Sequence, residues 1–196
     1  MKTLTKTLVA SALTAIVLTS SAITTFAANP VSPLVLSFKA ATVSFNKVVI
    51  TGNAKIILIK GLKEEVRIEE YYNPSKTTIA RKGYSLLINS TEKSPVTITV
   101  TVKDLCRIQA FDDASITTMG TLNLTYLQIF LNDNARADVK ANANSMYTIL
   151  KDASTLKLSG SAESHTYIAN NSEGIVFENF VCRKTDKLTS EPLASN

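Results

Sequence analysis

The stretch from Leu105 to Val176 repeats one short phrase, in which aspartate or asparagine precedes a small residue: Asp112-Asp113-Ala114, Asp133-Asn134-Ala135, Asp152-Ala153-Ser154 and Asn170-Asn171-Ser172. Each phrase lies between two short runs rich in β-branched and apolar residues. The third positions of successive phrases are 21, 19 and 18 residues apart. A period of this length is typical of stacked repeats, in which each repeat buries the apolar face of its neighbour.

The runs on both sides of each phrase alternate apolar and polar residues, which indicates β-strands with one buried face. We expect equivalent residues of successive repeats to form interior columns. Ile116, Ala137 and Leu156 would form one column, and Thr118, Val139 and Leu158 the next. In the preceding strands Cys106, Ile108 and Ala110 correspond to Leu127, Ile129 and Leu131, at a uniform spacing of 21 residues. The sequence therefore predicts an all-β fold, a right-handed β-solenoid resembling a parallel β-helix, with about four coils of ~20 residues in residues 105–176. A final strand at residues 175–182 would cap the solenoid, and residues 183–196 read as a polar tail.

An N-terminal β module is expected at residues 45–104, within one β domain that extends to residue 182. Residues 96–102 alternate Val or Ile with Thr without a break. Gly52-Asn53 joins two β-branched runs, as either a tight hairpin or a corner of the stack. No stretch after residue 27 has a helical period, and residues 28–44 read as an N-terminal arm.

Residues 1–27 have the order of a secretory signal peptide: Lys2 and Lys6, an apolar core, and Thr25-Phe26-Ala27 as cleavage site. The apolar core is shorter than the ~20 residues that a membrane span needs, so no span is expected after cleavage. Removal of the two lysines lowers the net charge from +5 to +3. This mild, scattered charge argues against nucleic acid as a partner. An exported protein of the periplasm, cell surface or medium is expected.

The two cysteines raise the question of a disulfide, because exported proteins often contain them. Cys106 and Cys182 are 76 residues apart. In a regular stack they would be separated by about four coils, or roughly 19 Å at ~4.8 Å per coil. A disulfide tolerates at most ~7 Å between Cα atoms. Free thiols are expected unless the chain folds back.

Three features follow the export signal one after another. The first is the opening Phe45-x-x-Val48-x-Ile50-x-Gly52, the second is the step formed by Gly83, Leu86 and Ile88, and the third is the set of ~20-residue repeats. In this pattern residues 42–182 resemble the head GIN domain of the family described as "putative auto-transporter adhesins". The resemblance implies a β-helical stack of short strands and an adhesive role, and it brings no catalytic residues. The corners of that family usually read Gly-Ser-Gly, whereas the corners here carry aspartate and asparagine.

The acidic corners form the sharpest candidate site. Asp112, Asp133, Asp152 and Asn170 would stack one per coil, and a column of oxygen atoms can bind Ca²⁺. Aspartate and asparagine are also favourable corner residues in their own right, because they tolerate left-handed backbone angles. Lys151 and Arg136 could neutralise the column. We therefore assign no metal site and no cofactor, and keep the four residues as candidates for a calcium titration.

Catalytic patterns are weak. Asp138 is the only outward acid within a repeat strand, between Arg136 and Lys140, and a solvated charged surface explains it. His165 is the only histidine and reads as a surface turn residue, and Tyr71-Tyr72 could pack at a turn or contact a ligand. We expect an exported, non-catalytic adhesion or binding module whose partner is a surface protein or a glycan. The alternatives are a carbohydrate-active β-helix enzyme and a purely structural envelope protein.

Overall fold

The computed structural model describes residues 34–36, 44–68, 72–170 and 174–189. The predicted signal peptide at residues 1–27 and almost all of the N-terminal arm lie outside these ranges. Within the described part, no helix is long and apolar enough to cross a membrane.

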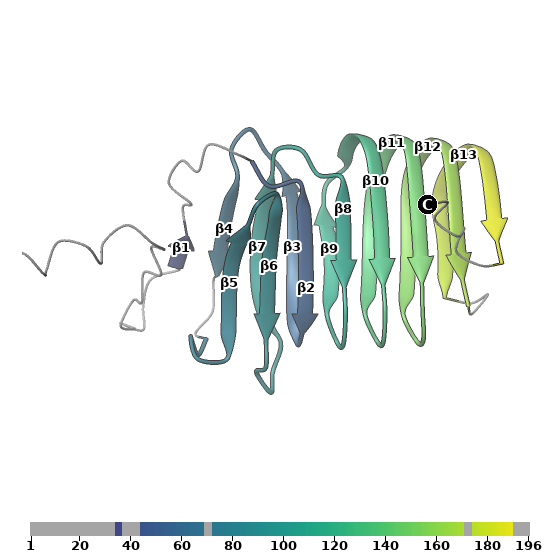
Figure 1. Ribbon diagram of the computed structural model, residues 1–196. Coiled ribbons are helices and arrows are strands. Elements are labelled where there is room, and N and C mark those ends of the chain that lie inside the picture. The colour runs from purple at the N-terminus through teal and green to yellow at the C-terminus, as the bar shows by residue number, and fades with distance from the viewer. Residues whose placement is uncertain (1–33, 37–43, 69–71, 171–173, 190–196) are drawn as a thin grey trace, which may run out of the picture.

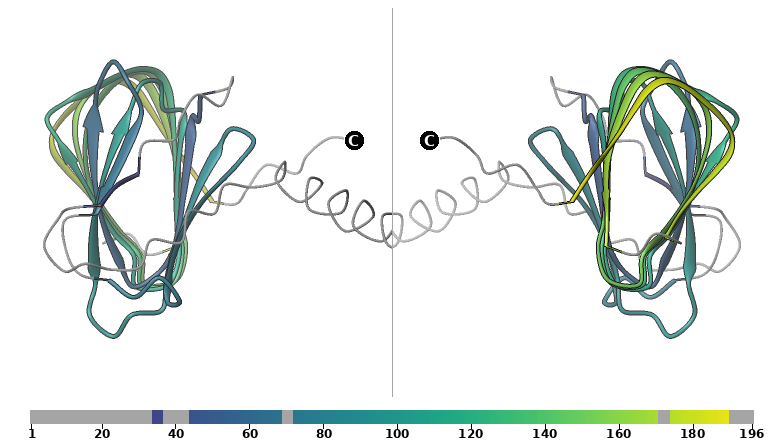
Figure 2. Two further views of the ribbon diagram at one scale, coloured as in Figure 1. Left: turned by 90° about the vertical axis from the view of Figure 1, so that its left-hand side faces the viewer. Right: turned by 90° about the vertical axis from the view of Figure 1, so that its right-hand side faces the viewer.

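All described strands join one curled sheet of 13 strands (Figures 1 and 2). Their bounds are β1 Leu34–Leu36, β2 Lys47–Gly52, β3 Ala54–Lys60, β4 Glu65–Ile68, β5 Thr77–Lys82, β6 Ser85–Ser90, β7 Val96–Val102, β8 Arg107–Ala110, β9 Ser115–Met119, β10 Leu122–Leu131, β11 Arg136–Leu150, β12 Thr155–Ala169 and β13 Ile175–Leu188. Seen along the stack, the sheet curls round so that two faces enclose the core (Figure 2).

The corner at Gly52-Asn53 separates two strands that lie in different faces. β2 pairs with β6 and β8, whereas β3 pairs with β7 and β9. The corner interpretation of this dipeptide is therefore correct, and the hairpin interpretation is not. Gly52 has φ +79, and a Cβ atom added there would lie 2.0 Å from the carbonyl oxygen of Ser90, so only glycine fits this corner.

The predicted right-handed parallel β-solenoid is wrong, because the sheet is mixed and its order is not sequential. The pairs β1–β4, β4–β7 and β5–β6 are antiparallel. β2 lies between β6 and β8, and β3 lies between β7 and β9, so the earliest paired strands of this region have later strands on both sides. A sequential solenoid would place them at one end. Here β6 and β7 lie on one side of β2 and β3, and β8 and β9 lie on the other side.

The register predicted from the repeats is nevertheless confirmed for the residues that pair, although Thr118 and Cys106, which were predicted to be interior, are only half-buried. Ala137 pairs with Ile116 on one side and with Leu156 on the other, and Ile129 pairs with Ile108. All five side chains are buried. Strand alternation explains the agreement, since a shift of one residue would turn every apolar side chain outward. A single apolar cluster extends from Phe45 to Ala162.

The last strand is longer than predicted. β13 continues to Leu188, so the polar stretch expected from residue 183 is partly strand. β13 pairs only with β12, and its register shifts between Leu158 and Gly160 of β12. Its other edge carries no strand in the described part of the chain.

Candidate functional site

A polar groove crosses the middle of the four last strands. It has a volume of about 740 Å³ and is lined by three consecutive residues of each strand, at 123–125, 142–144, 161–163 and 181–183. Lys60 and Asp104 complete the lining. The four segments are 19, 19 and 20 residues apart, so the groove follows the same repeat as the core.

Strand alternation explains which side chains face this groove. Asn123, Asn142 and Ser161 point away from the core, and Asn123 and Asn142 are exposed. Between them and the next outward residues, Ala143 and Ala162 point toward the core. Because alanine side chains are small, little side-chain volume has to be buried at the place where the sheet curls. The polar side chains of the four strands are thereby gathered in one surface depression.

The outward side chains form a hydrogen-bonded ladder. Asn142 Nδ2 donates to Asn123 Oδ1 at 3.0 Å, and Ser161 Oγ donates to Asn142 Oδ1 at 3.0 Å. At the end of the ladder, Lys60 Nζ donates to the Asn123 carbonyl oxygen at 3.0 Å. An amide carries two donor hydrogens and an acceptor oxygen with two lone pairs. The ladder therefore holds its side chains in place and still presents donors and acceptors to a ligand.

Charges in the groove are balanced. Lys60 and Asp104 carry opposite charges, and at the other side Arg183 Nη1 lies 3.5 Å from Glu163 Oε2. Both members of the latter pair are more than half exposed, so the pair contributes little to stability. The groove as a whole favours a neutral, polar ligand over a strongly charged one.

The corner column of aspartates is engaged with the backbone. Oδ2 of Asp112 accepts a hydrogen bond from the Gly52 N–H at 2.8 Å, Oδ2 of Asp133 accepts from the Asp112 N–H at 3.0 Å, and Oδ2 of Asp152 accepts from the Asp133 N–H at 3.3 Å. Each of these three aspartates has φ of 56–57°. Asn170 lies exposed beyond β12. The carboxylates thus join each corner to the next, which is a structural task.

Among the described residues, no three His, Cys, Asp or Glu side chains gather in a way that could hold a metal ion. Asp138 lies on the outer surface of β11, with Oδ2 3.7 Å from Lys157 Nζ. Lys157 also bonds to Glu178, and its pKa is raised by that hydrogen bond and by the charges of Glu178 and Asp138. Asp138 therefore belongs to an exposed ion-pair network.

His165 is buried, so its predicted place in a surface turn is wrong. It pairs in register with the buried Met146 and points into the core. Its Nε2 lies 3.0 Å from Thr148 Oγ1, and its ring packs against Phe177 and Phe180. Burial lowers the pKa of His165 from 6.5 to about 4. The Nδ1 atom is buried and has no hydrogen-bond partner among the described residues. The neutral ring is thus part of the core.

The remaining candidates have structural roles or lie outside the described residues. Cys106 and Cys182 are free thiols, as the spacing predicted for a regular stack. Tyr72 is partly buried against the core, and burial raises the pKa of its hydroxyl. Tyr71 lies outside the described residues.

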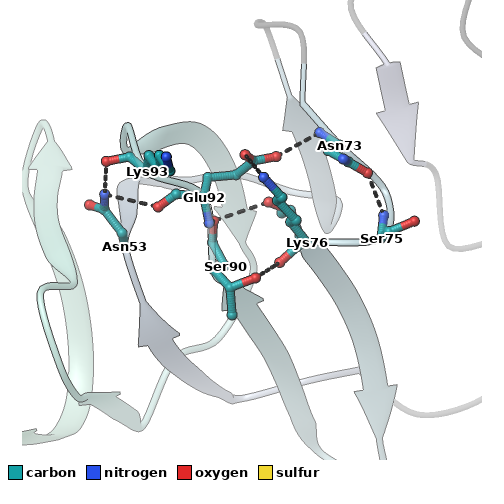
Figure 3. A network of polar contacts seen from close by, with 9 residues as sticks. Asn53, Asn73, Ser75, Lys76, Ser90, Glu92 and Lys93 are labelled. Carbon is teal, nitrogen blue, oxygen red and sulfur yellow. Dashed lines mark hydrogen bonds and ion pairs between the residues drawn. The ribbon is translucent and has the colours of Figure 1, made fainter.

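A second polar cluster fixes the loops that flank the β5–β6 hairpin (Figure 3). Glu92 Oε1 accepts from the Asn73 N–H at 2.8 Å, and Asn53 Nδ2 donates to the carbonyl oxygens of Glu92 and Lys93 at 3.3 and 3.1 Å. Glu92 Oε2 also lies 4.0 Å from Lys76 Nζ. Because these groups bond to one another, the cluster ties the two flanking loops to each other and to the corner at Asn53, and it offers little to a ligand.

Sequence reasoning missed the groove. Asn123, Asn142 and Ser161 read as ordinary outward polar positions, although their 19-residue spacing matches the repeat. Aligning the repeats by their strand centres, as well as by their corners, would have shown this polar column.

Comparison with known proteins places these observations in a family. The pattern of the family described as "Putative auto-transporter adhesin, head GIN domain" matches residues 44–186. No curated protein matches the chain. Solved structures share its fold at low identity, and the following three are among them.

A "putative adhesin" from Parabacteroides distasonis is 13% identical, with a TM-score of 0.58 over 80% of this chain and 76% of that one. A "putative lipid binding protein" from the same species is 12% identical, with a TM-score of 0.55 over 81% and 78%. A "putative adhesin" from Parabacteroides merdae is 16% identical, with a TM-score of 0.54 over 80% and 76%. At these identities the likeness concerns the fold alone.

Proposed function

Because the chain belongs to the auto-transporter adhesin head GIN domain family, we propose that it is an exported, non-catalytic binding module whose groove across β10–β13 holds a surface glycan. The adhesin descriptions of the family and of two structural relatives support a binding role. The relative described as a lipid-binding protein suggests an acyl chain as an alternative. The polar lining of the groove favours the glycan, because a buried acyl chain would leave the amides without partners.

The ladder of Asn123, Asn142 and Ser161 is the observation that carries this proposal. Sugar hydroxyls both donate and accept hydrogen bonds, and the ladder offers both kinds of group along a line. Four strands at ~4.8 Å spacing give a groove of roughly 14 Å between the outer strands, enough for a short oligosaccharide. Such a site needs only moderate affinity when many copies of a module act together.

The arrangement of acids supports a role without catalysis. Glycosidases act with two carboxyl groups that flank the scissile bond. The groove has two acids, Asp104 and Glu163, which lie on different elements, and Glu163 is paired with Arg183. Asp138, the acid that sequence reasoning singled out for an enzyme, belongs to the network around Lys157.

The test is a glycan array with the wild-type protein and the Asn142→Leu variant. Asn142 bonds to both of its neighbours in the ladder, and leucine keeps its approximate volume. We expect at least a tenfold loss of affinity, equivalent to about 1.4 kcal/mol. Asn89→Leu, at an exposed outward position of β6, is the matched control and should bind as wild type. Equal binding by both variants would place the ligand elsewhere.

Export is tested separately by sequencing the N-terminus of protein recovered from the envelope and the medium. Cleavage after Ala27 is expected. Release of reducing ends from any bound glycan, lost in Asp138→Asn, would favour the enzymatic alternative.

A further inference from the structure

The stack of strands ends at β13 with a long strand edge. β13 pairs only with β12, and among the described residues no strand lies along its other edge (Figure 1). Three of its apolar side chains are 40–71% exposed: Val176, Phe177 and Val181. A stack of repeats normally ends in a repeat with a polar outer face, and an open edge with apolar side chains is a template for a further strand. β13 therefore has the properties of an interface.

The charges of β13 are divided between its two halves. Residues 175–180 contain Glu178 as their single charged residue, whereas residues 182–188 contain three basic residues and one acid. Glu178 and Lys184 are exposed, although each also forms an ion pair within its own chain. A parallel strand of the same sequence would place like charges against each other, which is unfavourable. An antiparallel strand places the negative half against the positive half, twice, so the charges favour a second copy of this chain in antiparallel orientation.

The interior side of β13 is symmetric about its centre. Phe177, Cys182 and Thr185 pair with buried residues of β12 and so lie in the interior row, and Phe180 packs against the core. Successive members of this row are three, two and three positions apart, because the alternation of β13 is interrupted once on each side of its centre. The order is the same in both directions, and its midpoint is Val181.

An antiparallel register centred on Val181 keeps interior residues opposite interior residues. It places Phe177 of one copy opposite Thr185 of the other, and Phe180 opposite Cys182. A shift of one position would place all four of these residues opposite outward-facing ones, because directly opposed residues share one side of a sheet. The interior row therefore selects this register.

The outward side chains select the same register independently. It places Glu178 opposite Lys184 at two symmetric places, and it places the exposed Val181 against its own copy. A register centred on Cys182 would instead place Glu178 opposite Asp186, a repulsive pair. Charge and the alternation of the strand thus agree on one arrangement.

We propose that two copies of this chain pair their β13 strands antiparallel about Val181 and form a head-to-head dimer with two-fold symmetry. Both copies use the same surface, so the contact closes on itself and leads to no fibre. The hydrogen-bonding groups along the open edge of β13 gain partners, and the exposed apolar side chains at this end of the stack are covered.

The dimer also extends the groove. Residues 181–183 line the groove at its β13 end, and Val181 lies on the two-fold axis. The groove of one copy therefore continues into the groove of the other, with twice as many strands along one surface depression. This consequence rests on the proposed function of the groove, whereas the dimer itself does not.

Sedimentation equilibrium of the full chain, without any glycan, tests the dimer. Val181→Asp should weaken association at least tenfold, because two carboxylates would meet on the axis. Met119→Asp is the matched control: Met119 is 60% exposed, but β9 has strand neighbours on both sides, and this variant should associate as wild type does. A monomer at every concentration, or a dimer that Val181→Asp leaves unchanged, would overturn the proposal.

Engineered thiols test the register. In a Cys106→Ala, Cys182→Ala background, Val181→Cys should form a disulfide-linked dimer under mild oxidation at least tenfold faster than Val176→Cys. Both positions are exposed valines of β13. In the proposed register, however, the two copies of Val176 lie ten positions apart along the paired strands, well beyond the ~7 Å between Cα atoms that a disulfide tolerates. Equal rates would contradict the register.

Charge reversal tests the pairing without a cross-link. Glu178→Lys and Lys184→Glu should each weaken the dimer, and their combination should restore it, because opposite charges then meet again. Both variants lose their ion pairs within the chain, so a structural effect alone would add up in the double variant instead of cancelling. A double variant that associates no better than the single ones would refute the pairing. A monomer that still binds glycan would refute the dimer alone, whereas a dimer that binds no glycan would support the dimer and refute the proposed function.

Discussion

Acidification should destabilise the protein through His165. The ring is fully buried and is surrounded by neutral groups, Thr148, Tyr167, Phe177 and Phe180. Its pKa is about 4 in the folded chain, against 6.5 for an unperturbed histidine. The unfolded chain therefore takes up a proton below pH 6.5, while the folded chain resists it until about pH 4.

The sign and the size of the change in the free energy of unfolding follow from this difference in pKa. Because the folded pKa is lowered, the contribution of neutral His165 to stability is complete above pH 6.5 and is lost as the pH falls toward 4. At ~1.4 kcal/mol for each pKa unit, the full loss is about 3 kcal/mol. That is a large part of the 5–15 kcal/mol that typically stabilises a domain.

Urea unfolding between pH 7.5 and 4 measures the effect. The control is the double variant His165→Leu, Thr148→Val, which removes the titrating ring together with its hydrogen-bond partner and so leaves no buried hydroxyl unpaired. Carboxylates contribute to the pH dependence of both proteins, so the difference between the two profiles isolates His165. Wild type should lose about 3 kcal/mol more than the variant. Parallel profiles would refute the burial of a neutral ring.

Four further outcomes are expected. Gly160→Ala should abolish or severely weaken folding, because Gly160 has φ +104 and an added Cβ would lie 2.1 Å from the Ala141 carbonyl oxygen. Gly83 is the control, since it has φ +57 but open space around the position of a Cβ. Gly83→Ala should lower the free energy of unfolding in denaturant by only about 1–2 kcal/mol. Asp133→Ala should lower the free energy of unfolding by about 2 kcal/mol, since the Asp112 N–H loses its acceptor and alanine is strained at φ 57. Asp133→Gly should lower it by less, because glycine is not strained there. Equal losses would show that backbone strain does not contribute. Glu92→Ala should lower the melting temperature by several degrees because the Asn73 N–H loses its acceptor, and Glu92→Gln should lower it less. Millimolar Ca²⁺ should leave the melting temperature unchanged, because three corner carboxylates already bind backbone N–H groups; an upward shift would reveal a metal site.

The register of the strands was predictable, and their order was not. Alternation tells which side of a strand is buried, and the repeat length tells which residues lie side by side, so Ile116, Ala137 and Leu156 could be aligned from the sequence. Nothing local in β2 and β3 indicates that later strands will flank them on both sides. That arrangement depends on contacts between distant segments and on the antiparallel pairs at one end of the sheet.

The errors about individual residues have physical causes as well. The prediction of a surface turn for His165 rests on its place near a corner of the repeat, although it occupies the position of the buried Met146 one repeat earlier. The corner acids are a different case, because no metal site was assigned to them: Oδ2 of Asp112, Asp133 and Asp152 each accepts a hydrogen bond from a backbone N–H of a neighbouring corner, as expected for favourable corner residues. The groove was missed because it results from the curl of the sheet, which no single strand encodes.

The central claim is that the groove across β10–β13 is the binding site, and a hydrogen-exchange footprint tests it most directly. Exchange of backbone amides is measured with and without the glycan that gives the strongest saturable signal on the array. The account predicts slower exchange at residues 123–125, 142–144, 161–163 and 181–183, with no protection in the Asn142→Leu variant. Protection confined to the corners near Asp112 and Asp133, with none in these four segments, would contradict it.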